Sequence, residues 1–260
     1  MKAFHGDSKM KEFLVAQAVI HREQDQYIQG EYAKQNGKFR GCSMGCCAED
    51  LMRLTGKQIE HSSHEQQAEI LDVPVFFVKL QELFFERLPD GEYQQWTERL
   101  FEAVPVGADL SMALPMFLLK VLDGLPEQKD KDVAKAIKGS RAVIQEWVNT
   151  GEPNKDAAAE AAAEAARAAG AAAGAAADAA RAARAAAVVA DAADAAWAAD
   201  AADAAVVADA AGAAAWAADA ADAAVVADAA DAAWAARAAA EVAAWLRLSN
   251  DFLDCVRACK

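Results

Sequence analysis

The sequence lacks most of the features by which catalytic and membrane proteins are usually recognised. No stretch of 18 apolar residues is free of charge, because aspartate interrupts the alanine runs, and this argues against a membrane-spanning helix. A glycine-rich phosphate loop, an HExxH motif and a nucleophile elbow are also missing. The short apolar run EFLVAQAVI is flanked by charged residues, so we expect no secretory signal and predict a cytoplasmic location.

Hydroxyl side chains are absent from residues 156–248, which contain no threonine or serine. Alanine-rich ice-binding helices depend on regularly spaced threonine, so that function is disfavoured. The five cysteines are an odd number, and three of them cluster near residue 45. Without a secretory signal, reduced thiols are the expectation.

Positive charge is also scarce. The chain has 26 Lys and Arg against 40 Asp and Glu, a formal net charge of −14, and residues 156–248 hold 5 of the basic and 14 of the acidic residues. Such a surface repels phosphate, so we expect no direct binding to nucleic acid and no binding to an anionic membrane. The expected partner is another protein, which includes a basic protein or a second copy of this chain.

Alanine dominates the second half of the chain. Between Asp156 and Leu248, 58 of 93 residues are alanine, whereas nine of the ten phenylalanines lie in the first 150 residues. Because an alanine side chain buries little area, the ordinary core must come mainly from the first part. We therefore predict a helical domain at 1–150, an acidic alanine-rich helical repeat at 156–248 and a helical tail at 249–260.

Apolar residues in the first part recur at helical spacing, and no alternating pattern indicates a strand, so the predicted class is all-α. A first helix is expected over Lys9–Gln29, and a second is expected to begin at Asp72 with Pro74 in its first turn. The expected buried positions of the first helix are Phe13, Ala16, Ile20 and Tyr27. Those of the second are Phe76, Phe77, Leu80, Leu83, Phe84 and Leu88.

The alanine-rich part is predicted to form several packed helices, because alanine has the highest helix propensity of any residue. Aspartate at every third position moves around such a helix, whereas an 18-residue interval, as between Trp216 and Trp234, restores the starting angle. Trp and Val-Val alternate at about half that interval, so they lie on opposite faces with alanine between them. This pattern favours neighbours on both sides, with turns at Gly170, Gly174 and Gly212.

The segment GCSMGCCAED is the one pattern typical of metal ligands. Cys42 and Cys46 with His61 and His64 offer two thiolates and two imidazoles at a spacing close to that of zinc sites, so one structural zinc, or no cofactor, is expected. The simpler explanation is that the cysteines are small buried residues and the histidines are solvated. A third is a reactive thiol, Cys46 or Cys47, with His64 as base and a helix start that lowers the thiol pKa.

Two further patterns have simple explanations. His21 and Asp25 are four residues apart, which is typical of an exposed polar pair on one helix face. The aspartates of the alanine-rich part could imitate a phosphate array and so inhibit a nucleic-acid-binding protein. We favour the interpretation that they keep the alanine-rich part in solution.

Several segments together carry a resemblance to a known group of proteins: HREQDQYIQG, GCSMGC, SSHEQQAEILDVP, LFFERLPDG and AVPVGADLS, followed by an alanine-rich end. They resemble a family of uncharacterised bacterial and phage-associated proteins, over roughly residues 1–150. The resemblance implies no activity and no site residue. The leading hypothesis is a non-enzymatic interaction or scaffold protein. A zinc- or thiol-dependent enzyme and a DNA-mimicking inhibitor are the alternatives.

Overall fold

The computed structural model describes residues 1–35, 38–172, 179, 181 and 226–260. Its class is all-α, as predicted, and the described residues contain nine α-helices. The sequence pattern did not predict a short β-hairpin with two residues in each strand. In it, Lys34–Gln35 (β1) pairs antiparallel with Phe39–Arg40 (β2). Two residues per strand are too few to produce a recognisable alternation.

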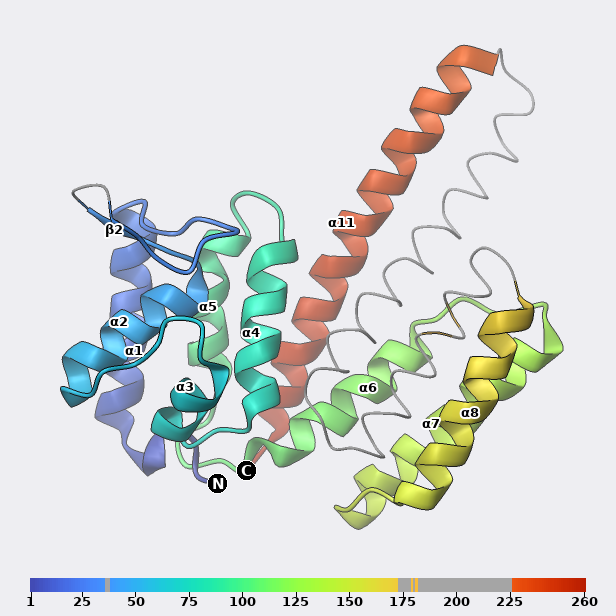
Figure 1. Ribbon diagram of the computed structural model, residues 1–260, viewed down its shortest axis with the longest axis horizontal. Helices are drawn as coiled ribbons and strands as arrows, with labels where there is room; N and C mark the ends of the chain where they lie inside the picture. The colour runs from blue at the N-terminus through green and yellow to red at the C-terminus, as the bar shows by residue number, and fades with distance from the viewer. Residues whose placement is uncertain (36–37, 173–178, 180, 182–225) are drawn as a thin grey trace. The chain divides into compact units, whose positions relative to one another are not determined.

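The chain divides into two compact units, one of which is built from two separate stretches of the sequence (Figure 1). The core unit is Met1–Leu114 together with Ser249–Lys260, and the inserted unit is Pro115–Leu248. This division differs from the boundary predicted near residue 150. The composition changes at that point, but the helices on its two sides pack against each other, as described below.

The core unit is built from five α-helices and the end of a sixth. In chain order its elements are η1 (Ala3–Gly6), α1 (Ser8–Glu23), β1, β2, α2 (Ser43–Thr55), α3 (His64–Leu71), α4 (Val75–Arg87), α5 (Tyr93–Ala103), η2 (Leu110–Met112) and the last turns of α11 (Val226–Ala258). Helix α5 packs against α1 and α4, whereas α2 contacts α1, α3 and α4 (Figure 1). Phenylalanine and leucine side chains from α4 and α5 fill the centre.

Helix α1 differs from the prediction in its end and in its buried face. Its first turn is capped by Asp7, whose carboxylate accepts a hydrogen bond from the Lys9 amide at 2.8 Å. It ends at Glu23, six residues before the predicted end. The buried positions are Leu14, Ala18 and His21, not Phe13, Ala16 and Ile20. Both sets have helical spacing, so spacing alone did not decide between them.

The stretch between α3 and α4 shows a second correction. Asp72 does not cap the start of α4; it ends α3, in a left-handed conformation with φ of 52°. Pro74 takes the N-cap position of α4 instead. Five of the six predicted stripe positions of α4 are buried, with Phe77, Leu80 and Phe84 fully so, whereas Leu83 is half-buried.

The predicted C-terminal tail is the end of α11, and its side chains complete the core unit. The ring of Phe252 lies 6.2 Å from that of Phe77 and 5.8 Å from that of Phe84, centroid to centroid. The main chain is fixed there as well, because the Asp109 amide donates to the Lys260 carbonyl at 2.9 Å. Residues 249–260 are therefore part of the same hydrophobic core as the first hundred residues.

The inserted unit contains α6 (Ala113–Asp123, which begins just before it), α7 (Lys131–Thr150) and α8 (Lys155–Ala171). Helix α7 ends at Gly151, with φ of 82°, and Asn154 caps α8 by accepting a hydrogen bond from the Ala157 amide. The two helices lie side by side (Figure 1). The predicted turn at Gly170 was wrong, because this residue lies inside α8, which continues to Ala171. The predicted turns at Gly174 and Gly212 and most of the Trp and Val-Val alternation lie outside the described residues.

Helix α8 shows how an alanine helix of this chain is held. Its buried positions are Ala158, Ala161, Ala165 and Ala168, while Glu160 and Arg167 are exposed. The buried residues of α7 also recur mostly at intervals of three and four: Val133, Ala136, Ser140, Val143, Ile144 and Trp147. Intervals of three and four residues on both helices are typical of a close antiparallel pair, in which small side chains let the backbones approach.

Candidate functional site

The cysteine cluster lies at the start of α2. Cys42 occupies the N-cap position, and Cys46 and Cys47 follow within the first turns of the helix. All three are almost fully buried, with exposed fractions of 1%, 1% and 2%. They are free thiols, as predicted.

The two glycines of the GCSMG segment make room for a crossing backbone. A Cβ atom at Gly41 would lie 2.4 Å from the Tyr32 carbonyl oxygen, and one at Gly45 would lie 1.5 Å from the same oxygen. The crossing strand is held by the Cys42 amide, which donates to the Glu31 carbonyl at 2.7 Å. The motif that suggested a metal site is therefore explained by a steric requirement.

The thiols are protonated at neutral pH. Burial raises the pKa of Cys42 to about 11, and the amides of Gly45 and Met44 oppose this effect without cancelling it. Burial, with the nearby Asp50 carboxylate, raises the pKa of Cys46 and of Cys47 further still. The prediction that the helix start lowers a thiol pKa was wrong, because loss of solvation outweighs the helix dipole at a buried position.

Each of the two predicted ligand histidines is paired with a glutamate. His61 Nε2 lies 2.9 Å from Glu49 Oε1, and His64 Nε2 lies 2.5 Å from Glu82 Oε2. Cys46 Sγ, in contrast, points toward the Gly41 carbonyl oxygen at 3.6 Å. In the part of the chain that the structure describes, no three His, Cys, Asp or Glu side chains gather closely enough to hold a metal ion. Cys42, Cys46, His61 and His64 therefore do not form a ligand set here.

Glu82 is the residue that connects the cysteine and histidine regions. Burial disfavours its charged form, but hydrogen bonds from His64 and Tyr32 and the charge of His64 outweigh burial and lower the pKa of Glu82. The same carboxylate helps to keep the Cys42 thiol protonated. Among the residues that the structure describes, no hydrogen bond joins His64 to Cys46 or Cys47, and both thiols are buried with a raised pKa, so the arrangement does not favour a thiol activated by this histidine.

A small cavity of about 250 Å³ opens beside these groups. Its lining residues are Gly30, Glu31, Tyr32, Cys42, Glu82 and Glu86. The Glu86 carboxylate accepts a hydrogen bond from the Gly30 amide at 2.7 Å. The cavity thus presents carboxylates and a protonated thiol, which is not an arrangement for nucleophilic attack.

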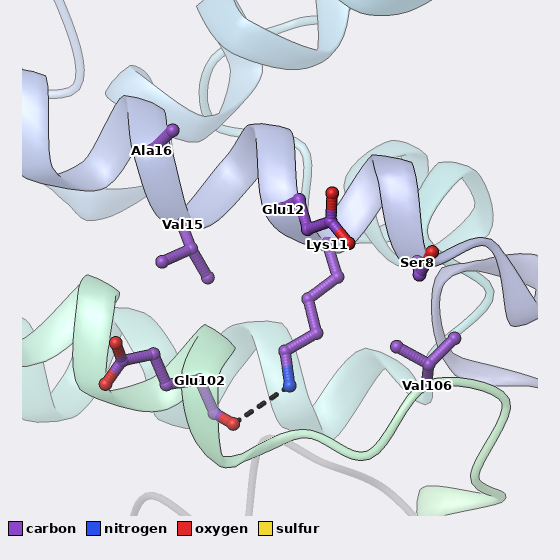
Figure 2. Close-up of a pocket in the computed structure, with 7 residues that line it drawn as sticks. All are labelled: Ser8, Lys11, Glu12, Val15, Ala16, Glu102 and Val106. Carbon is purple, nitrogen blue, oxygen red and sulfur yellow. Dashed lines mark hydrogen bonds between the residues drawn. The ribbon is translucent and has the colours of Figure 1, made fainter.

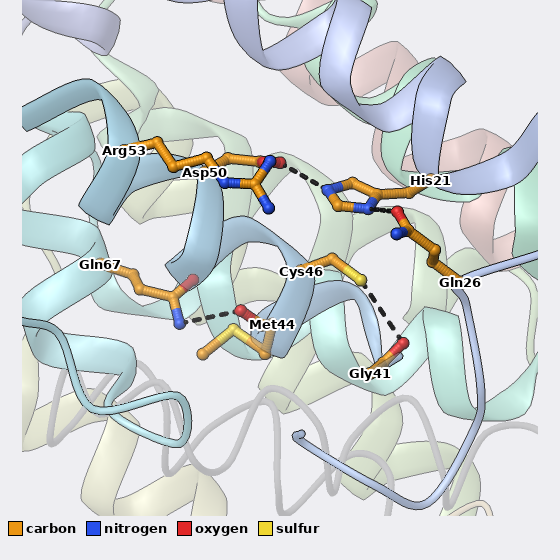
Figure 3. Close-up of polar contacts among 8 residues, drawn as sticks. All are labelled: His21, Gln26, Gly41, Met44, Cys46, Asp50, Arg53 and Gln67. Carbon is orange, nitrogen blue, oxygen red and sulfur yellow. Dashed lines mark hydrogen bonds and ion pairs between the residues drawn. The ribbon is translucent and has the colours of Figure 1, made fainter. Parts of the chain in front are cut away.

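Sequence reasoning missed a buried polar network around His21 (Figure 3). The His21 ring is 2% exposed; its Nε2 lies 2.8 Å from Asp50 Oδ2 and its Nδ1 lies 2.5 Å from Gln26 Oε1. The predicted exposed pair with Asp25 was wrong. Asp25 lies beyond the end of α1 with φ of 52°, and it pairs with Arg40.

The spacing of α1 places His21 in this network only once the buried face of the helix is known. His21 follows Leu14 by seven residues and Ala18 by three, so it continues the buried face of the helix. The network ties α1 to α2, and the stretch after α1 joins it, because the Tyr27 ring lies 5.7 Å from that of His21. The network therefore holds these backbone segments in position relative to one another.

Comparisons with known proteins add no identity. No protein-family model, no curated protein and no solved structure matches the chain. In the described part of the chain, no helix is both long enough and apolar enough to cross a membrane. Function must therefore be argued from the geometry of this chain alone.

Proposed function

We propose that this protein is a non-enzymatic interaction or scaffold protein whose acidic alanine-rich helices pack against helices of another protein molecule, either a second copy or a different chain. The observation that carries the proposal is the pairing of α7 and α8, in which four alanines of one helix are buried against a neighbour. An isolated helix is only marginally stable in water, and an alanine-rich helix has little apolar area to bury. Such a helix therefore depends on close packing against another helix.

The exposed side of α8 supports the same function. Ala159, Ala163 and Gly170 are exposed and lie four, seven and eleven residues apart, so they form a second small-residue face. A further helix can approach that face closely, as α7 approaches the first. The thiols and histidines of the core unit support a structural role for that unit, since the thiols are protonated and the histidines are paired with carboxylates.

A cytoplasmic location belongs to the proposal, because buried, unpaired cysteines suit a reducing compartment. The zinc- or thiol-enzyme and DNA-mimic alternatives have less support. For the first, no hydrogen bond joins Cys42, Cys46 or Cys47 to a histidine in the described structure, and burial raises the pKa of all three thiols. For the second, no described feature favours a phosphate-like array.

The test combines two measurements on the full chain. Sedimentation velocity over a wide range of concentrations tests self-association. A photo-crosslinking residue at Ala163, with the exposed Lys57 as a matched control position, tests for a different partner in the producing cell. We expect either concentration-dependent association or one discrete adduct that forms from position 163 and not from position 57. A monomer at every concentration, together with no discrete adduct at position 163, would overturn the proposal.

A further inference from the structure

A surface groove of about 610 Å³ lies along one side of the core unit (Figure 2). One wall is the first half of α1, and the other is the end of α5 with the loop that follows it. Its lining residues are Ser8, Lys11, Glu12, Val15, Ala16, Glu102 and Val106. This volume lies in the range that holds a ligand of drug size or several side chains of a peptide.

The single lysine of the groove is already bound to main-chain atoms. Lys11 Nζ donates to the carbonyl of Glu102 at 2.9 Å and to that of Val104 at 2.8 Å (Figure 2). These carbonyls belong to the last turn of α5 and the residue that ends it, where a cation also interacts favourably with the helix dipole. Lys11 thus joins the two walls of the groove and does not pair with its carboxylates.

The two carboxylates of the groove stand on opposite walls. Glu12 projects from α1 and Glu102 from α5 (Figure 2). Both side chains are exposed, and within the described ranges neither carboxylate has an ion-pair or hydrogen-bond partner. Val15 and Val106 point into the space between the walls, which the Lys11 side chain crosses, and Val106 is 39% exposed, which is high for a large aliphatic residue.

This combination determines the kind of occupant. Arginine and lysine lay their aliphatic stems on apolar surface while the charged end reaches a carboxylate. The core unit as a whole carries 14 Lys and Arg against 20 Asp and Glu, so its field attracts a basic segment and repels an anionic one. Two carboxylates alone are too few to retain a metal ion, and no metal-binding group occurs among the described residues.

We propose that this groove binds a short basic segment of a partner protein, with aliphatic side chains against Val15 and Val106 and Lys or Arg side chains on Glu12 and Glu102. The inference rests on the proposed function, since it assigns a partner chemistry and a second contact surface to an interaction protein. The inference is supported by the two carboxylates, which complement a basic segment, and by the apolar side chains of Val15 and Val106.

The experiment uses the full chain and a synthetic peptide in which Leu-Leu-Arg is repeated four times, with the Leu-Leu-Glu repeat as the peptide control. Fluorescence anisotropy measures affinity, and amide chemical shifts locate the site. The double variant Glu12→Gln, Glu102→Gln is compared with Glu65→Gln, Glu69→Gln, which removes the same charge from the exposed face of α3. A Val106→Ser variant tests the contribution of the apolar side chains that point into the groove.

We expect the Kd of the Arg peptide to rise at least tenfold in the groove variant, several-fold in Val106→Ser, and by less than twofold in the α3 variant, with shifts confined to α1, α5 and residues 104–107. Equal weakening in both double variants would show nonspecific charge attraction and would overturn the proposal. Shifts located elsewhere, or groove shifts that grow with protein concentration in the absence of peptide, would overturn it as well. None of these outcomes affects the crosslinking result at position 163, so the two proposals fail separately.

Discussion

The crossing of the Tyr32 backbone over the cysteine segment predicts that Gly45 cannot be replaced even by alanine. Gly45 lies inside α2, where alanine would by itself stabilise the helix by about 1 kcal/mol. The added Cβ, however, would lie 1.5 Å from the Tyr32 carbonyl oxygen and 2.6 Å from its carbon. An ordinary contact begins near 3.4 Å, so one backbone segment must move by about 2 Å.

That movement breaks identifiable interactions. The Cys42 amide loses the Glu31 carbonyl, and a buried amide left without an acceptor costs about 1–3 kcal/mol. Overpacking at a buried site costs about 1–3 kcal/mol more. After subtraction of the gain in helix propensity, we expect Gly45→Ala to lower the free energy of unfolding of the core unit by about 3 kcal/mol.

The matched control is Gly139→Ala in α7. Gly139 is also inside a helix, but the nearest atom to its added Cβ is Glu164 Oε2 at 3.8 Å, so only the propensity gain of up to about 1 kcal/mol is expected. Urea unfolding followed by circular dichroism, with hydrogen exchange measured by mass spectrometry to separate the two units, gives both values. If α2 in the Gly45→Ala variant were as stable as α2 in the natural chain, the steric explanation of the two glycines in GCSMG would be refuted.

Three further predictions follow from the core unit. Phe252→Ala should lower its stability by about 3–5 kcal/mol, seen in urea unfolding, because the ring is fully buried; a loss under 1 kcal/mol would contradict the shared core. The pKa of Glu82 is lower in the folded chain than in the unfolded chain. The ionised side chain therefore adds to the free energy of unfolding above the unfolded pKa of about 4.3, and this contribution is lost as the pH falls through the folded pKa. Glu82→Gln should flatten that part of a stability–pH curve, and an unchanged curve would argue against the His64 pair. With a pKa of about 11, Cys42 has on the order of a hundredfold less thiolate at pH 8 than a thiol of pKa 9.0. Iodoacetamide should therefore label Cys42 in the native protein more slowly than in urea, by at least that factor. Equal rates would contradict burial of the thiol.

Periodicity was enough to predict the all-α class and the helix that follows Asp72, and the reason is local. The stripe of α4 depends on residues within a few turns of one another. The buried face of α1 was not predictable in the same way. Phe13 and Ile20 are as apolar as Leu14, and the choice between faces depends on which one meets α2 and α5.

The cysteine segment shows the same limit at the level of a site. Its spacing to the histidines resembles a zinc site, but spacing holds no information on what the chain places between the two groups. In the structure, Glu49 and Glu82 meet the histidines, and the Tyr32 backbone requires the glycines. None of these partners is near its contact in sequence, so no local pattern could have identified them.

The position of the inserted unit in the chain has a physical consequence for how the alanine-rich part is maintained. The core unit needs Phe252 to cover Phe77 and Phe84, and Phe252 is reached only after the whole alanine-rich part has been synthesised. A chain that stops within residues 156–248 therefore lacks Phe252 and leaves the apolar side chains that it covers exposed on the core unit. Folding of the core and completeness of the alanine-rich part are in this way coupled, although the alanines themselves contribute little burial energy.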